Sequence, residues 1–278
     1  MGFLTDLVRA RRSELDAHPL DVERLVRAAS TQRPPRSFAD ALRGRSDLAV
    51  IAEVKRASPS AGAIAAGADP VARVTAYAAG GAAAISVLTE ATHFDGSLAD
   101  LRAVAGAVDL PLLRKDFIVT EAQVAEARAA AADSVLLITS CLSDDELGAL
   151  LVHARSFEME PLVETHDDAD LERALATDAR VVGVNARNLE TLEIDVEAAL
   201  MRLRRIPDDR IAVLESGVRT RAHAAAAVSA GASAILVGEA LMRAEDPAST
   251  IRVLRAARAD ANGRMAERPT EPEQEEPA

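Results

Sequence analysis

A hydrophobic run followed by an alanine-rich stretch of helical period occurs eight times between residues 49 and 258. The runs are short, rich in Val, Ile and Leu, and bounded by turn residues, which is typical of buried parallel strands connected by helices. The strands are expected at Ala49–Val54, Ala84–Leu88, Leu110–Arg114, Ser134–Ile138, Glu160–Val163, Val181–Val184, Ile211–Leu214 and Ala234–Val237. The helices are expected near Pro70–Ala79, Leu98–Val108, Glu121–Ala131, Asp144–Ser156, Asp167–Ala176, Val196–Arg205, Thr220–Ala230 and Ala248–Arg258. Strand starts twenty to thirty-odd residues apart predict an α/β fold of the (β/α)8 TIM barrel type, and an open doubly wound sheet is the alternative.

The junctions from helix to strand form a weak internal repeat. They read Ala79-Gly80-Gly81-Ala82, Ala130-Ala131-Ala132-Asp133, Ala176-Thr177-Asp178-Ala179 and Ala230-Gly231-Ala232-Ser233. A left-handed residue commonly ends a helix, and Gly or Asp suits that conformation. Ala131 and Asp178 stand where glycine is expected, and a left-handed Ala131 would cost about 1 kcal/mol.

The ends of the chain differ from its repetitive middle. Residues 1–47 are expected to form a helical extension packed on a barrel of residues 48–260, with an amphipathic helix at Phe3–Leu15 and a short helix capped by Ser37. Residues 261–278 form an acidic tail that includes five Glu, three Pro and one Arg after position 266. Such a composition cannot bury enough apolar surface to order itself, so we expect the tail to be disordered.

Composition excludes several classes of function. The net charge of −12, the 2% aromatic content and the absence of Trp argue against a nucleic-acid partner. The apolar run Val135–Ile138 is far shorter than a membrane span, so no membrane insertion is expected. The single cysteine, Cys141, cannot form an internal disulfide, and the N-terminus lacks the pattern of a signal peptide, so we expect a cytoplasmic protein.

Polar residues gather where six of the eight expected strands end. Parallel barrel strands are buried on both faces, and the active site of such barrels lies at the carboxyl ends of the strands. Glu53 and Lys55 are two residues apart on the first strand, so their side chains point the same way. The others at these ends are Lys115, Glu164, Asn185, Arg187, Glu215, Ser216 and the pair Gly238-Glu239. Any one of them could be a structural ion pair, but burying so many without use would be costly.

Counting the carboxylates Glu53, Glu164 and Glu215 against the cations Lys55, Lys115 and Arg187 gives a set with no net charge, which suits acid and base chemistry. Neighbouring carboxylates would keep a lysine protonated, whereas burial would lower its pKa. Which of the two effects dominates is left open by the sequence.

Two glycine-containing loops, Glu215-Ser216-Gly217-Val218 and Val237-Gly238-Glu239-Ala240-Leu241, follow the last two strands. This is where many barrels bind phosphate, through backbone N–H groups and a short helix. The simpler interpretation is that Gly217 and Gly238 only turn the chain. The Glu239 side chain is expected to point away from a bound phosphate.

Several long motifs in fixed order resemble the indole-3-glycerol phosphate synthase family over roughly residues 3–258. The matching segments are residues 51–60 (IAEVKRASPS), 85–90 (ISVLTE), 94–97 (FDGS), 113–119 (LRKDFIV), 160–164 (EPLVE), 183–192 (GVNARNLETL), 215–218 (ESGV) and 236–242 (LVGEALM). The resemblance implies closure of an indole ring from 1-(2-carboxyphenylamino)-1-deoxyribulose 5-phosphate, with loss of carbon dioxide and water. It implies no cofactor and no metal, and we expect a monomer whose only partner is this phosphorylated small molecule.

The resemblance also implies roles for individual residues. Lys115 looks like the general acid that protonates the ribulose carbonyl, Glu164 like the carboxylate that assists dehydration, and Lys55 would lie near the departing carboxylate or hydroxyl. Glu53, Asn185 and Glu215 would orient the substrate and the lysines. The substrate-binding residues would be Ser58, Phe117 and Arg187 at the anthranilate end and Ser216, Gly217 and Gly238 at the phosphate. The N-terminal helix would cover the mouth and exclude water.

Other interpretations remain open at this stage. Phosphoribosylanthranilate isomerase resembles the chain in its barrel but would use a Cys/Asp pair, and Cys141 follows the fourth strand rather than the first. Lys115 at a strand end also fits a Schiff-base aldolase, and a barrel that binds without catalysis is a third alternative. The five histidines show no metal-ligand spacing, and we interpret them as surface or loop residues.

Overall fold

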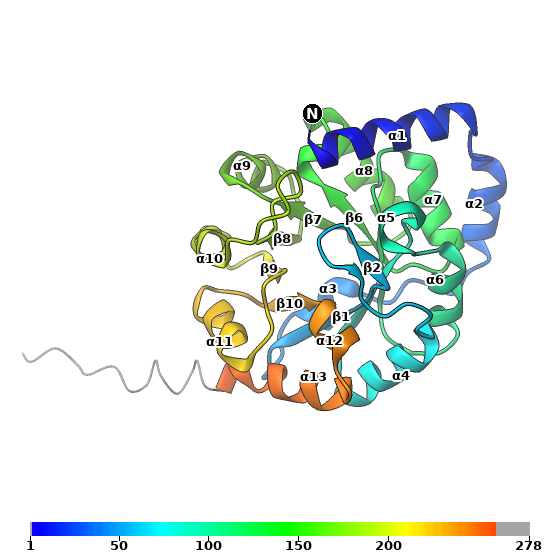
Figure 1. The fold of residues 1–278 in the computed structure, drawn as a ribbon. Coiled ribbons are helices and arrows are strands. Elements are labelled where there is room, and N and C mark those ends of the chain that lie inside the picture. Colours follow the sequence, from blue (N-terminus) through cyan, green and yellow to red (C-terminus); the bar gives the residue numbers. More distant parts are fainter. Residues whose placement is uncertain (1, 260–278) are drawn as a thin grey trace, which may run out of the picture.

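The computed structural model describes residues 2–259, so the expected tail of residues 261–278 lies outside the described part. Eight parallel strands close into a barrel, in the order β1, β10, β9, β8, β7, β6, β5 and β4 (Figure 1). They are β1 (Ala49–Val54), β4 (Ala84–Leu88), β5 (Leu112–Lys115), β6 (Ser134–Ile138), β7 (Leu162–Thr165), β8 (Val181–Asn185), β9 (Ile211–Glu215) and β10 (Ala234–Val237). The predicted (β/α)8 barrel is confirmed, and the open doubly wound alternative is wrong.

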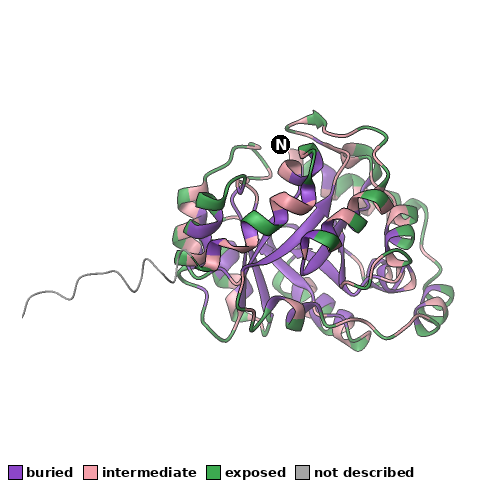
Figure 2. Cartoon of the chain, turned by 90° about the horizontal axis from the view of Figure 1, so that it is seen from below, coloured by how far each residue is buried: buried purple, intermediate pink, exposed green. Residues whose placement is uncertain are grey.

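Helices surround the barrel, and their outer faces are exposed while the strands are buried (Figure 2). They are α4 (Pro70–Gly80), α6 (Leu98–Ala105), α7 (Glu121–Ala129), α8 (Asp144–Ser156), α9 (Asp168–Ala176), α10 (Val196–Leu203), α11 (Arg221–Ser229) and α13 (Pro247–Arg255). Smaller elements in the loops are β2 (Ala57–Ser58), β3 (Gly62–Ala63), α5 (Ala91–Phe94), η1 (Thr139–Cys141) and α12 (Glu239–Arg243). All eight predicted helices are present, with ends that differ by a few residues.

Two strands begin later than expected. We predicted strands from Leu110 and Glu160, whereas β5 begins at Leu112 and β7 at Leu162. Each true start directly follows a proline, Pro111 or Pro161, and proline has no N–H for the strand ladder. The same shift makes Lys115 the last residue of β5 and places Glu164 inside β7, so rigid strands hold both side chains.

The helix-to-strand junctions match the predicted repeat in three of four cases. Gly81, Ala131 and Gly231 have φ of 83°, 69° and 98°, so the expected left-handed strain at Ala131 is present. Asp178 is not left-handed, because α9 ends in an extended Thr177 whose Oγ1 donates to the carbonyl of Ala174. That side-chain bond removes the need for a left-handed cap at this junction.

Three helices precede the barrel: α1 (Phe3–Ala17), α2 (Val22–Ser30) and α3 (Phe38–Leu42). The Ser37 cap was predicted correctly, since its side chain accepts a hydrogen bond from the Asp40 N–H. Helix α2 was not expected from the sequence; it packs on α7, with Leu25 and Ala29 buried. Buried Asp133 binds Arg33 Nη1 at 2.7 Å and the backbone N–H of Leu112 at 2.9 Å, which joins the extension to the barrel. Within residues 2–259, no helix is both long and apolar enough to cross a membrane.

Candidate active site

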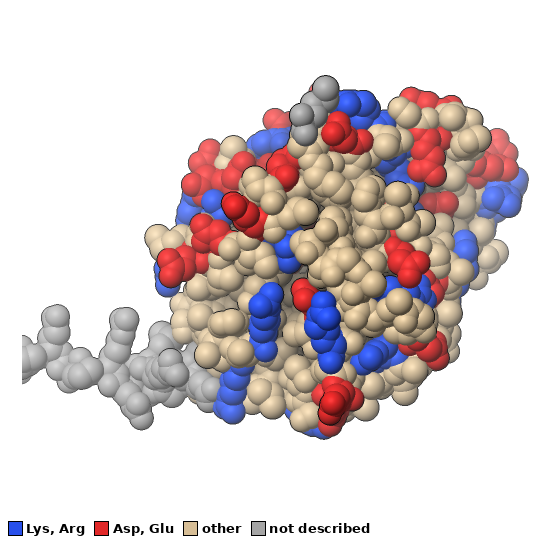
Figure 3. All heavy atoms as spheres, viewed as in Figure 1, with Lys and Arg blue, Asp and Glu red and all other residues tan. Residues whose placement is uncertain are grey.

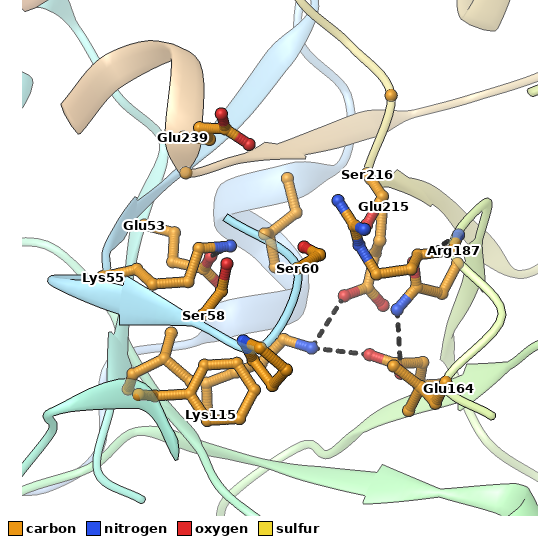
Figure 4. A pocket seen from close by; sticks show the side chains of 18 of the residues that line it. Glu53, Lys55, Ser58, Ser60, Lys115, Glu164, Arg187, Glu215, Ser216 and Glu239 are labelled. Carbon is orange, nitrogen blue, oxygen red and sulfur yellow. Dashed lines mark hydrogen bonds and ion pairs between the residues drawn. The ribbon is translucent and has the colours of Figure 1, made fainter. Parts of the chain in front are cut away.

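One pocket opens at the carboxyl ends of the barrel strands, and every residue expected at the site lines it. It encloses about 1100 Å³ of empty space including its mouth, which is ample for a sugar phosphate bearing an aryl group. The expected residues that line it are Glu53, Lys55, Ser58, Lys115, Phe117, Glu164, Asn185, Arg187, Glu215, Ser216, Gly217 and Gly238. The side chains converge on the cavity from elements far apart in the sequence (Figure 4).

Lys115 joins two carboxylates across the floor of the pocket (Figure 4). Its Nζ lies 2.6 Å from Glu164 Oε2 and 3.0 Å from Glu215 Oε2. Asn185 Nδ2 donates to the other Glu164 oxygen at 3.1 Å. The lysine side chain is 12% exposed and both carboxylates are almost fully buried, so these charges interact with little solvent screening.

The charges of this cluster decide its protonation. Burial would lower the pKa of Lys115, but the carboxylates of Glu164, Glu215 and Glu53 outweigh it and raise that pKa, so the ammonium form is favoured. Burial would raise the pKa of Glu164, yet Lys115 and His166 hold it well below its usual range. Burial and the negative Glu164 raise the pKa of Glu215 to about 8. The open question from the sequence is therefore answered: nearby charge outweighs burial at Lys115.

A second ion pair lies on the first strand. Lys55 Nζ is 2.9 Å from Glu53 Oε1, and the Ser86 hydroxyl donates to Glu53 Oε2 at 3.4 Å. Both side chains face the pocket, as their spacing of two residues predicted. Lys55 is 21% exposed, so it can reach a ligand while Glu53 stays buried.

The glycines at the site make room for its carboxylates. A Cβ on Gly238 would lie 2.4 Å from Glu53 Oε1, and a Cβ on Gly183 would lie 2.3 Å from Glu215 Oε1. Gly217 has a φ of 77°, and its Cβ would also lie 2.5 Å from Val196 Cγ2. Gly217 is thus fixed by its backbone conformation, whereas Gly238 has a negative φ and is fixed by Glu53.

Ser216 adds strain beside Gly217. Its φ of 64° is unusual for a residue with a side chain and costs about 1 to 3 kcal/mol. Such strain is concentrated at functional sites. Glu239 also lines the pocket, and its carboxylate accepts a hydrogen bond from Arg243 Nε at 3.1 Å within α12.

The apolar wall lies opposite these loops. Phe117 is buried and packs against Phe94 with ring centroids 6.3 Å apart. Phe3 is the α1 residue that lines the pocket, so α1 contributes one side chain to the rim. Buried Asp116 links the helix to this wall, since it lies 3.4 Å from Arg11 and accepts from the Phe117 N–H at 2.9 Å.

Two residues near the site were not predicted from the sequence. His166 was interpreted as a surface or loop residue, and the surface interpretation is wrong: its side chain is 9% exposed and Nε2 lies 3.0 Å from Glu164 Oε1. The signal was available, because His166 follows Glu164 by two residues, the spacing used for Glu53 and Lys55. Arg219 lines the pocket after Val218 and adds positive charge near the glycine loop.

On the face of the molecule shown in Figure 3, Lys and Arg side chains (blue) group near the middle, and Asp and Glu side chains (red) lie mainly toward the edge.

Cys141 takes no part in this pocket. It lies in η1 and lines a separate cavity, and burial raises its pKa, so it is a poor acid or base at neutral pH. Within residues 2–259, no group of three or more His, Cys, Asp or Glu side chains is arranged to hold a metal ion.

Solved structures of other enzymes share this architecture. A 3-hexulose-6-phosphate synthase matches with a TM-score of 0.61 and 20% identity, over 76% of this chain and 99% of the other. A thiamine phosphate pyrophosphorylase from Pyrococcus furiosus matches with a TM-score of 0.58 and 15% identity, over 81% of this chain and 99% of the other. At these identities the likeness establishes the fold alone.

The fold and the lysine-carboxylate pocket define a (β/α)8-barrel enzyme equipped for proton transfer. The family model for indole-3-glycerol phosphate synthase matches residues 4–254. A protein of that name from Micrococcus luteus is 47% identical over 92% of this chain and 98% of its own length, and one from Nocardioides sp. is 49% identical over 91% and 97%. The protein named indole-3-glycerol phosphate synthase 1 of Streptomyces coelicolor is 48% identical over 91% and 94%. The chain belongs to the indole-3-glycerol phosphate synthase family, whose members are decarboxylating lyases.

Proposed function

We propose that this protein converts 1-(2-carboxyphenylamino)-1-deoxyribulose 5-phosphate into indole-3-glycerol phosphate, carbon dioxide and water, with Lys115 as the general acid. The observation that carries the proposal is the position of Lys115 Nζ, 2.6 Å from Glu164 and 3.0 Å from Glu215. This arrangement gives a proton donor and a proton acceptor side by side in one buried site.

The first step forms a carbon-carbon bond. The aromatic carbon that carries the carboxylate attacks the C2 carbonyl of the ribulose chain, and the Lys115 ammonium donates a proton to the carbonyl oxygen, which becomes a hydroxyl. Because the pKa of Lys115 is raised, the lysine carries this proton before the substrate arrives. Release of carbon dioxide leaves the bonding electron pair on the ring and restores its aromaticity.

The second step removes water from the closed ring. Glu164 accepts a proton from the ring CH₂ group, while the hydroxyl formed from the ribulose C2 carbonyl takes up a proton from the Lys115 ammonium and leaves as water. The low pKa of Glu164 means that its carboxylate is ionised and ready to accept. Lys55 is placed near the departing groups in this scheme, because its ammonium is partly exposed to the pocket.

Binding follows from the remaining side chains. Arg187 and Ser58 take the anthranilate carboxylate, and Phe117 packs against the aromatic ring. Ser216, Gly217 and Gly238 bind the phosphate through the loops after β9 and β10. Glu53, Asn185 and Glu215 orient the sugar hydroxyls and the two lysines.

The test follows the indole fluorescence of the product. The protein should generate that fluorescence from the substrate, and Lys115→Met should abolish turnover while leaving binding largely intact. Lys115→Arg is the matched control for charge, because a guanidinium keeps its positive charge but does not release a proton. Near-normal turnover in either variant would show that Lys115 is not the acid.

Two alternatives have their own readouts. Borohydride reduction in the presence of a carbonyl substrate would trap a Schiff-base aldolase covalently, and an adduct at Lys115 would overturn the proposal. A barrel that only binds would retain the substrate without producing fluorescence. We also propose a cytoplasmic monomer, since the pocket is complete within one chain and the single cysteine fits a reducing compartment.

A further inference from the structure

A second cavity lies directly beside the active site. It encloses about 680 Å³ of empty space including its opening. It is lined by α1, by η1, by the start of α9 and by the loop after β8, through Leu4, Thr5, Val8, Ser140, Cys141, His166, Asp167, Asp170, Asn188, Leu189 and Glu190. None of these residues except Leu189 also lines the active-site pocket, so the two spaces are separate on most of their walls.

His166 stands in the wall between the two spaces. Its Nε2 lies 3.0 Å from Glu164 Oε1 on the active-site side, and its Nδ1 lies 3.5 Å from Asp170 Oδ2 on the other. The backbone N–H of His166 also donates to Asp170 Oδ2 at 3.2 Å. Both ring nitrogens are buried, and each lies within ion-pair distance of a carboxylate, so a protonated imidazole can donate on both sides.

The contacts form a continuous line of groups that exchange protons. It runs from Asp170 through His166 and Glu164 to Lys115, with the last contact 2.6 Å long. Two carboxylates face the His166 ring, Glu164 on β7 and Asp170 on α9, and Arg173 lies 3.9 Å from Asp170. The acidic residues Asp167 and Glu190 line the same cavity. Burial would lower the pKa of His166, but Asp170 and Glu164 raise it to about 9, so the imidazole carries a proton at neutral pH.

The reaction itself consumes a proton. The substrate enters with its carboxylate ionised and leaves that group as neutral carbon dioxide, so one proton must be taken up in each cycle. Two protons go to oxygen, one to the carbonyl and one to the departing hydroxyl, and only one returns from the ring CH₂ group. A substrate that fills the mouth covers Lys115, whose side chain is only 12% exposed.

We propose that His166 is a positioning residue that also relays this proton from the second cavity to Glu164, and so restores the ammonium form of Lys115. After ring closure has left Lys115 as the free amine, Nε2–H gives its proton to Glu164 Oε1, the carboxyl group rotates, and the same oxygen gives the proton to Lys115. Glu164 is then ionised again and can accept the ring CH₂ proton, which it passes to Lys115 after the restored ammonium has protonated the departing hydroxyl. Water in the second cavity then returns a proton to the imidazole. No electrons are transferred, and the balance is one solvent proton per product. This proposal rests on the proposed function.

The test compares His166→Gln with His166→Ala. Glutamine keeps a polar side chain of similar length but carries no titratable proton, so kcat should fall by roughly 10²-fold, the lower end of what proton transfer contributes. KM should change little, because His166 does not line the active-site pocket. Added imidazole should restore turnover to His166→Ala through the second cavity. Normal kcat in His166→Gln, or no rescue of His166→Ala by imidazole, would overturn the relay and show that His166 only packs in the wall between the two cavities.

A second variant tests the chain without touching Glu164. Asp170→Asn removes a charge that raises the pKa of His166, so its imidazole should titrate at lower pH, and the alkaline fall of kcat should move with it. Nuclear magnetic resonance follows that imidazole in the resting protein, without turnover. An unshifted titration and an unshifted kcat profile would contradict the relay. Cys141→Ala is the control, since it changes the same cavity without removing a charge and should leave both profiles unchanged. Fluorescence from the unaltered protein in the same series tests the proposed function separately.

Discussion

Replacing Gly183 with alanine should move one carboxylate of the site while sparing the fold. The added Cβ would lie 2.3 Å from Glu215 Oε1 and 3.2 Å from Leu162 Cδ1, and ordinary contacts begin near 3.4 Å. The carboxylate must therefore retreat by about 1 Å, which breaks its 3.0 Å contact with Lys115. A misplacement of that size at a catalytic group costs about 10²-fold in rate, and overpacking costs about 1 to 3 kcal/mol of stability.

The assay measures kcat/KM by indole fluorescence and the free energy of unfolding by denaturant titration on the same samples. Gly148→Ala is the matched control, because Gly148 lies inside α8 with no atom within 4 Å of its added Cβ. That variant should keep full activity and gain about 0.5 to 1 kcal/mol of stability. Full activity in Gly183→Ala, or a loss of activity explained entirely by unfolding, would refute the idea that Gly183 positions Glu215.

Three further perturbations test other parts of the structure. The pKa of Glu215, raised from 4.5 to about 8, means that the group stays neutral below that pH. As pH rises through about 8 the pocket gains a negative charge, so kcat/KM for the anionic substrate should fall. The stability that the raised pKa supplies at low pH is lost between 4.5 and 8. A pH profile of kcat/KM for Glu215→Gln that still fell near 8 would contradict this. Ala131→Gly should stabilise the protein by about 1 kcal/mol, since it relieves the strain of a φ of 69° after the end of α7. Denaturant titration measures this change, and a loss of stability would show that the left-handed residue is not strained. Glu190→Ala removes the acceptor for Leu4 N–H, Thr5 N–H and the Thr5 hydroxyl at the start of α1. KM should therefore rise several-fold with little change in kcat, and an unchanged KM would show that α1 does not contribute to substrate binding.

Strand number, strand direction and the pocket lining could be predicted, because they depend on the hydrophobic periodicity of the sequence and on the position of polar residues at the strand ends. Buried parallel strands must be apolar, so a charged residue at the end of such a strand marks the mouth of the barrel. Glu53 and Lys55 needed only the alternation of side chains along a strand. The strand starts after Pro111 and Pro161 could also have been predicted, because proline cannot donate to the ladder.

What the sequence could not provide were contacts between distant elements. The repeat suggested a left-handed Asp178, but a hydroxyl bond from Thr177 satisfied the helix end instead. The role of Gly238 depends on Glu53, which lies 185 residues away and faces it only once β1 and β10 are neighbours. Likewise, the protonation of Lys115 depends on distances to carboxylates on β7 and β9.

The choice between lysine and arginine carries a signal of its own. Two of the 32 basic residues are lysines, Lys55 and Lys115, and both line the active-site pocket. Partly buried ion pairs elsewhere use arginine, as where Arg56 binds Asp100 through two contacts of 2.7 Å. Arginine suits such two-pronged pairs and does not release its proton, whereas a lysine can. A chain that uses arginine for structure and keeps lysine for its pocket separates charge from proton transfer, and that separation supports Lys115 as a proton donor independently of any motif.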